Sequence, residues 1–82
     1  MKKIKAVTYL TPFKMNDGEA PSLTLGRTYR VKWAKYYLDS CDTRFFILDD
    51  DNSTHYFDTG STDEDLRTEE HFYIEYGEEI AR

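Results

Sequence analysis

Apolar and polar residues alternate along most of this chain, a pattern typical of half-buried β-strands rather than of helices. The stretch IKAVTYL, from Ile4 to Leu10, predicts a first strand. The next stretch, TPFKMNDGEAPS, predicts a loop because two prolines, a glycine, an asparagine and an aspartate fall close together. Long loops often carry binding residues, so this segment is a candidate position for function.

The stretch RTYRVKWAKYY predicts one long strand that begins after a turn at Gly26. One face carries Tyr29, Val31, Trp33 and Lys35, and we expect that face to pack on the core. The other face carries Arg30, Lys32, Ala34 and Tyr36. Cationic side chains are therefore expected beside an aromatic ring on the solvent side.

Two further strands flank an acidic turn. The stretch TRFFILD contains four consecutive apolar residues, Phe45 to Leu48, which predicts a strand covered on both faces, and THYFD is its expected partner. Between them lie three aspartates and Asn52. Asn52 is the residue best able to adopt a left-handed backbone, so a hairpin is predicted here.

The spacing changes after Gly60. Ser61 or Thr62 can cap a short helix, and acidic residues in its first turn favour the helix dipole. We expect this helix to end near Glu70, because the β-prone HFYIEY that follows predicts a last strand from His71 to Tyr76.

Three segments, LTLGRTYRV, ILDDDNSTHYF and EEHFYIE, resemble the turn motifs of small bacterial and phage SH3-like barrel proteins. The resemblance covers Leu23 to Glu75 and implies a mainly β fold, a small five-stranded SH3-like barrel with one short helix before the last strand. The chain length and the order of the elements predict a single SH3-like domain over residues 1–76 and a C-terminal tail over 77–82. Two features depart from the pattern: the hairpin lacks the usual glycine, and the insert at 61–70 is longer than one turn.

Length and composition limit the class of protein. Eighty-two residues provide one hydrophobic core, and the aromatic fraction of 16% must supply much of it. A single cysteine, Cys41, excludes an internal disulfide. The basic N-terminus lacks the long apolar run of a signal peptide, and nothing approaches a membrane span. These features predict a cytoplasmic protein with no membrane association.

Charge is distributed unevenly along the chain. Residues 1–48 hold nine Lys or Arg against four Asp or Glu, whereas residues 49–82 hold two against twelve. The balances of +5 and -10 sum to the net charge of -5. The acidic pI of about 4.9 argues against nucleic acid as a partner unless the acidic half lies away from the basic strand.

Sites for metal or catalysis do not emerge from the spacing. A calcium loop needs a glycine at its sixth position and a glutamate at its twelfth, but a loop starting at Asp49 places Thr54 and Gly60 there. Cys41, His55 and His71 follow no zinc-ligand spacing. We therefore expect that the protein is not an enzyme and that it has no cofactor, no metal site and no catalytic residue.

Three functions remain, and the first is favoured. A non-enzymatic SH3-like binding module, a small bacterial or phage accessory protein, would contact another protein as a monomer or homodimer, using exposed aromatic residues and charged loops. The partner-binding residues expected for this surface and for its acidic rim are Tyr36, Tyr37, Asp49, Asp50, Asp51, Tyr56, Asp63, Glu64 and Asp65.

The first alternative is an acidic protein that imitates nucleic acid and inhibits a DNA- or RNA-binding enzyme, as anti-restriction or anti-CRISPR proteins do. It requires aspartates 49–51 to share one face with the carboxylates of 62–70. The second alternative is nucleic-acid binding through the basic strand 27–37, with Arg27, Arg30, Lys32 and Lys35 as the contact residues.

Overall fold

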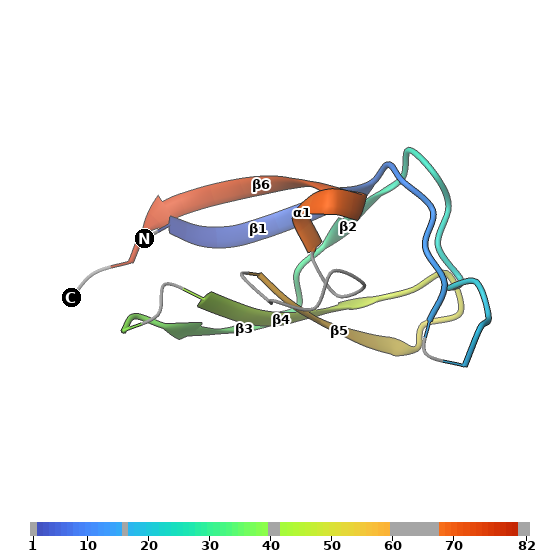
Figure 1. The fold of residues 1–82 in the computed structure, drawn as a ribbon. Helices are drawn as coiled ribbons and strands as arrows, with labels where there is room; N and C mark the ends of the chain where they lie inside the picture. The colour runs from blue at the N-terminus through green and yellow to red at the C-terminus, as the bar shows by residue number, and fades with distance from the viewer. Residues whose placement is uncertain (1, 16, 40–41, 60–67, 81–82) are drawn as a thin grey trace.

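A computed structural model describes residues 2–15, 17–39, 42–59 and 68–80. These residues form two antiparallel sheets of three strands each, which lie one above the other (Figure 1). The upper sheet has the order β2-β1-β6 and the lower sheet β3-β4-β5. The elements are β1 (Lys2–Tyr9), β2 (Thr28–Arg30), β3 (Trp33–Tyr37), β4 (Asp42–Leu48), β5 (Thr54–Asp58), α1 (Thr68–His71) and β6 (Phe72–Glu79).

The predicted five-stranded SH3-like barrel is wrong, although the mainly β character is confirmed. Six strands form two separate sheets in the described part of the chain, and they do not close into a barrel there. The extra strand arises because the predicted long strand breaks after Arg30. The Val31 N–H donates to the Lys5 carbonyl in one sheet, and the next N–H, of Lys32, donates to the Phe46 carbonyl in the other.

The break also reverses part of the predicted face assignment. Tyr29 is buried as expected, but Trp33 and Lys35 point to solvent, whereas Ala34 and Tyr36 pack against the core. A strict alternation across residues 29–36 would keep Trp33 inside. Because the chain changes sheets after Val31, Lys32 and Trp33 are exposed in succession and the alternation restarts on the opposite face.

The predicted helix over residues 61–70 does not match either. Helical residues in the described ranges are the four of α1, a single turn that ends at His71 and leads directly into β6. Residues 61–67 lie outside the described residues. No described helix is long and apolar enough to cross a membrane. The last strand continues to Glu79, so part of the expected tail belongs to the sheet.

The core lies between the two sheets and is built largely from aromatic rings. Val7 from one sheet and Phe45 and Ile47 from the other are fully buried. Phe57 bridges the layers, since its ring centroid lies 5.6 Å from that of Phe45 and 5.1 Å from that of Phe72. The inward-facing side chains of both sheets thus pack against one another, and the outward-facing side chains are the ones a partner can reach.

Candidate functional site

The first of the three consecutive aspartates is enclosed by the hairpin between β4 and β5. The Asp49 carboxylate accepts hydrogen bonds from the backbone N–H of Asp51 at 2.9 Å and of Ser53 at 2.8 Å, and its Oδ2 lies 2.8 Å from His55 Nε2. Its side chain is only 4% exposed. Asn52 occupies the tip with a φ of 62°, which confirms the predicted left-handed position.

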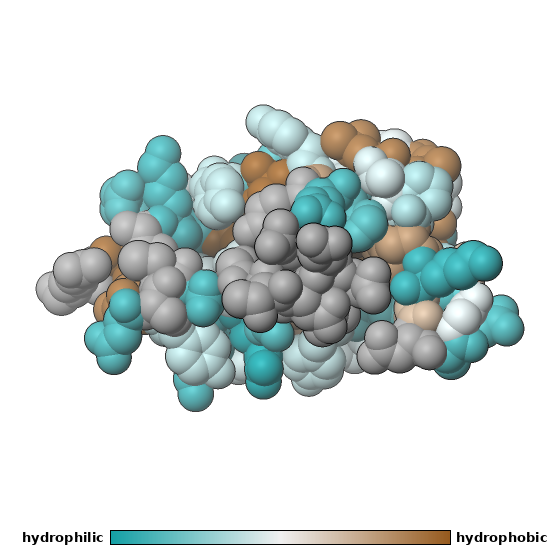
Figure 2. Space-filling view, in the orientation of Figure 1, coloured by the Kyte–Doolittle hydropathy of each residue, from teal (hydrophilic) through white to brown (hydrophobic). Residues whose placement is uncertain are grey.

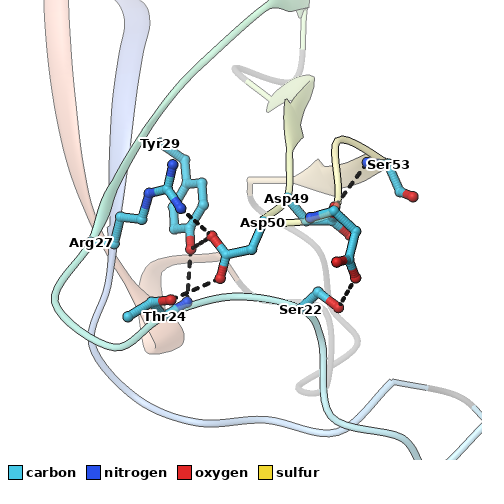
Figure 3. A network of polar contacts seen from close by, with 8 residues as sticks. Ser22, Thr24, Arg27, Tyr29, Asp49, Asp50 and Ser53 are labelled. Atoms are coloured by element: carbon cyan, nitrogen blue, oxygen red, sulfur yellow. Dashed lines mark hydrogen bonds and ion pairs between the residues drawn. The ribbon is translucent and has the colours of Figure 1, made fainter.

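The second aspartate ties the hairpin to the segment before β2 (Figure 3). The Asp50 carboxylate accepts hydrogen bonds from Thr24 Oγ1 at 2.7 Å and from the Tyr29 hydroxyl at 2.8 Å, and it forms an ion pair of 2.5 Å with Arg27. Tyr29 OH in turn accepts a hydrogen bond from the Thr24 N–H. Two segments about 25 residues apart in sequence are thereby joined through one carboxylate.

The third aspartate adds a contact to the same segment. Ser22 Oγ donates to Asp51 Oδ2 at 2.6 Å, and the Ser22 carbonyl accepts the Asp50 N–H at 2.8 Å. We term this set of linked side chains the hairpin network. It consists of the three aspartates together with Ser22, Thr24, Arg27, Tyr29, Ser53 and His55.

The hairpin network shifts the pKa values of Asp49, Asp50 and Tyr29. Burial raises the pKa of Asp49, but hydrogen bonds from Ser53, Asp51 and His55 outweigh burial and hold that pKa below its ordinary range. Hydrogen bonds from Thr24 and Tyr29, followed by the Arg27 charge, lower the pKa of Asp50. Burial, followed by the hydrogen bond to Asp50, raises the pKa of the Tyr29 phenol. Both carboxylates are thus stabilised as anions by their own chain.

This arrangement bears on the hypothesis of nucleic-acid mimicry. A mimic must present free carboxylates to a basic groove, whereas those of Asp49 and Asp50 are already bound within the chain. Asp51 is exposed and makes one side-chain contact, with Ser22. Asp63, Glu64 and Asp65 lie outside the described residues. Asp50 is exposed as well, but its carboxylate already binds Thr24, Arg27 and Tyr29, so Asp51 has the fewest side-chain contacts of the three aspartates predicted at the hairpin.

The outer surface of the β3-β4-β5 sheet carries a row of aromatic side chains across all three strands. Trp33 pairs with Phe46, and Phe46 pairs with Tyr56 in the strand register. The ring centroids are 6.0 Å apart for the first pair and 5.4 Å for the second. Trp33 is 44% exposed and Tyr56 is 63% exposed. We term the outer surface of this sheet the aromatic face. It holds this aromatic row and, beside it, a charged row of Lys35, Arg44 and Asp58.

The charged row follows the same register one step further along the strands. Lys35 pairs with Arg44, and Arg44 pairs with Asp58. Arg44 Nε lies 3.0 Å from Asp58 Oδ1, and that carboxylate raises the pKa of the guanidinium. Lys35 Nζ lies 5.3 Å from the centroid of the Tyr37 ring, a cation–π contact. The face thus places Lys35 at one edge strand, Arg44 on the central strand and Asp58 at the other edge strand.

The predicted aromatic contact residues divide between the surface and the core. Tyr37 and Tyr56 are exposed, as a contact surface requires. Tyr36 turns inward, where its hydroxyl accepts the Ile4 N–H at 2.9 Å. The sequence pattern places Trp33 in the core and Phe46 in a doubly covered strand, so it misses both as surface residues. The alternation of Arg44 with Phe46 is the available signal, because it puts Phe46 on the solvent side.

The predicted basic face is not brought together. Arg27 binds Asp50 in the hairpin network, and Arg30 lies on the other sheet, where it lines a shallow groove with Lys3, Lys5 and Glu78. Lys32 and Lys35 remain beside Trp33. The four cations of strand 27–37 therefore lie in three different places: the hairpin network, the groove on the β2-β1-β6 sheet and the surface around Trp33.

Other chemistry on the described residues is sparse. Among them, no group of three or more His, Cys, Asp or Glu is placed to hold a metal ion. His71 Nδ1 lies 3.3 Å from the Thr11 carbonyl, and Cys41 lies outside the described residues.

Figure 2 shows apolar surface at the end where the loops after β1 and before β2 lie, and Leu10 and Leu25 are exposed in these loops.

No family model, curated protein or solved structure matches this chain. The functional proposal therefore depends on surface chemistry. Two assemblies stand out, the hairpin network and the aromatic face, and the second is the one that exposes aromatic rings to a partner.

Proposed function

We propose that the protein is a non-enzymatic binding module that contacts another protein through the aromatic face. The observation that carries the proposal is the outer row in which the exposed Trp33 and Tyr56 flank the half-buried Phe46, on a sheet whose opposite side already packs the core. Aromatic residues and arginine are enriched at the centres of protein interfaces, where they bury large areas with few rotatable bonds.

The charge of the face favours a protein over nucleic acid. Its outward strand positions hold Lys35 and Arg44 against Asp42 and Asp58, a balanced set to which the exposed Lys32, just before β3, adds one cation. A surface that binds a polyanion needs a clear cationic excess, since phosphate contacts supply most of the affinity. A balanced set beside exposed rings suits a partner surface that carries both signs of charge.

The test compares two variants of the immobilised protein in a lysate of its source organism. The double variant Trp33→Ala with Tyr56→Ala removes the outer rings of the row, and Tyr73→Ala removes a ring that is 60% exposed on the other sheet. Mass spectrometry should identify a protein retained by the unaltered chain and by Tyr73→Ala but lost with the double variant. Circular dichroism checks that all three chains stay folded.

Two results would contradict the proposal. One is a partner that the double variant retains, because binding would then lie elsewhere. The other is fluorescence anisotropy showing that a single-stranded oligonucleotide binds at low salt and is lost in the double variant, since the face would then serve nucleic acid.

A further inference from the structure

A twofold axis parallel to β4 and above its outer side makes the aromatic face complementary to itself. We propose that its partner is a second copy of this chain, so that two β3-β4-β5 sheets pack face to face as a homodimer. The inference rests on the proposed function, because it uses the same face, and it names the occupant.

The strand register sets the apolar part of the contact. In the order β3-β4-β5, the central strands of the two copies face each other across the axis, and each edge strand lies over the opposite edge strand of the second copy. Trp33 of one copy then lies over Tyr56 of the other, and Phe46 lies over Phe46. Two sheets packed in this way stand about 10 Å apart, a gap that aromatic side chains from both sides fill.

The charged row follows the same symmetry and supplies the specificity. Lys35 on β3 and Asp58 on β5 occupy equivalent heights on opposite edge strands, each in register with Arg44. The twofold axis therefore places Lys35 of each copy over Asp58 of the other, which makes two intermolecular ion pairs. Arg44 meets its own counterpart at the axis but keeps the Asp58 carboxylate of its own chain, 3.0 Å away.

The size of the face sets the strength expected. Three strands about 4.8 Å apart and about five residues long present a patch well below the roughly 800 Å² per partner of a standard interface. Small interfaces give weak complexes, so we expect a dissociation constant on the order of 10⁻⁵ M. The dimer should therefore form as the concentration rises and dissociate on dilution.

The decisive experiment is a charge exchange followed by sedimentation equilibrium. Lys35→Asp alone would set a new carboxylate over Asp58 at both edges of the dimer, and Asp58→Lys alone would set a new ammonium over Lys35 at both edges. Each variant should therefore be a monomer of 9.7 kDa. In an equal mixture, the new carboxylate of the first variant faces the new ammonium of the second, and the unaltered Asp58 of the first faces the unaltered Lys35 of the second. A heterodimer should form as a result.

A spectroscopic signal accompanies the change in mass. Trp33 is the one tryptophan of the chain and lies in the aromatic row, so its fluorescence reports on this face alone. Its emission should shift to shorter wavelength when the unaltered chain is concentrated and when the two variants are mixed. Neither variant by itself should show the shift.

Each outcome decides the question. Dimerisation of the unaltered chain, loss in each single variant and recovery on mixing support the pairing. A molecular mass that stays that of the monomer up to a protein concentration of roughly 1 mM, well above the expected dissociation constant, would overturn the proposed dimer. A dimer that Trp33→Ala leaves intact would also overturn it. Because capture of a different protein on the aromatic face would survive a monomeric result, failure of this inference is distinguishable from failure of the proposed function.

Discussion

Asp49 and His55 meet inside the hairpin between β4 and β5, where Asp49 Oδ2 lies 2.8 Å from His55 Nε2. The same carboxylate holds two backbone N–H groups of the turn, at 2.8 and 2.9 Å. Asp49→Ala leaves these donors without their acceptor. Chemical denaturation should show a loss of about 1–3 kcal/mol in the free energy of unfolding.

Asp51→Ala is the matched control, because it removes the same charge from the same run of aspartates. Asp51 is exposed and its side chain accepts one hydrogen bond, from Ser22. We expect a change within about 0.5 kcal/mol. Equal losses in the two variants would show that charge, and not the enclosed contacts of Asp49, determines the effect.

The stability of the fold should decline at both ends of the pH range. The pKa values of Asp49 and Asp50 are lowered in the folded state, so their contribution is present above the ordinary carboxylate pKa of about 3.9 and is lost as the pH falls through the folded values. The pKa of Tyr29 is raised, so its contribution is present below about 10 and is lost as the pH rises through the folded value.

The measurement is the urea midpoint from about pH 2 to about pH 11, a range that spans the ordinary carboxylate and phenol pKa values. The acid decline should flatten in Asp50→Asn, which removes one of the two carboxylates, and the alkaline decline should flatten in Tyr29→Phe. An acid decline unchanged in Asp50→Asn would assign the effect to other carboxylates.

The position of Asn52 gives a backbone test of the same hairpin. Its φ of 62° lies in the left-handed region, which costs most residues about 1–2 kcal/mol. Asn52→Gly should leave the free energy of unfolding nearly unchanged, whereas Asn52→Ala should lower it by about 1 kcal/mol. Thermal denaturation of the pair measures this, and equal melting temperatures would contradict the assignment.

The sequence predicted the fold where local rules decide. Alternation located β1, the apolar run Phe45 to Leu48 located β4 with β5 as its hairpin partner, and turn chemistry identified the left-handed Asn52. The break after Arg30 was not predictable, because neither a glycine nor a proline marks positions 31 and 32. The N–H groups of Val31 and Lys32 find their acceptors in different sheets only in the folded chain. Tertiary hydrogen bonding thus decided both the strand count and the orientation of Trp33.

The candidate site shows the same limit. Three adjacent aspartates suggested an acidic surface, but Thr24, Arg27 and Tyr29 approach Asp50 only after folding. Phe46 stands within an apolar run in which only Arg44, two residues earlier, marks its solvent side. Composition identified the chemistry of these residues, while register determined which of them share a surface.

A final prediction separates the aromatic face from the core. Phe45 and Phe46 are neighbours in β4, yet Phe45 is fully buried between the sheets and Phe46 lies in the outer row beside Trp33. Phe45→Ala should cost about 3–5 kcal/mol and leave much of so small a protein unfolded. Trp33→Ala removes a partly exposed ring that stacks on Phe46, so it should lower the free energy of unfolding by only about 1 kcal/mol at concentrations where copies stay apart. Denaturant titration at low protein concentration measures both, and a large loss from Trp33→Ala would return that residue to the core and remove the centre of the aromatic face.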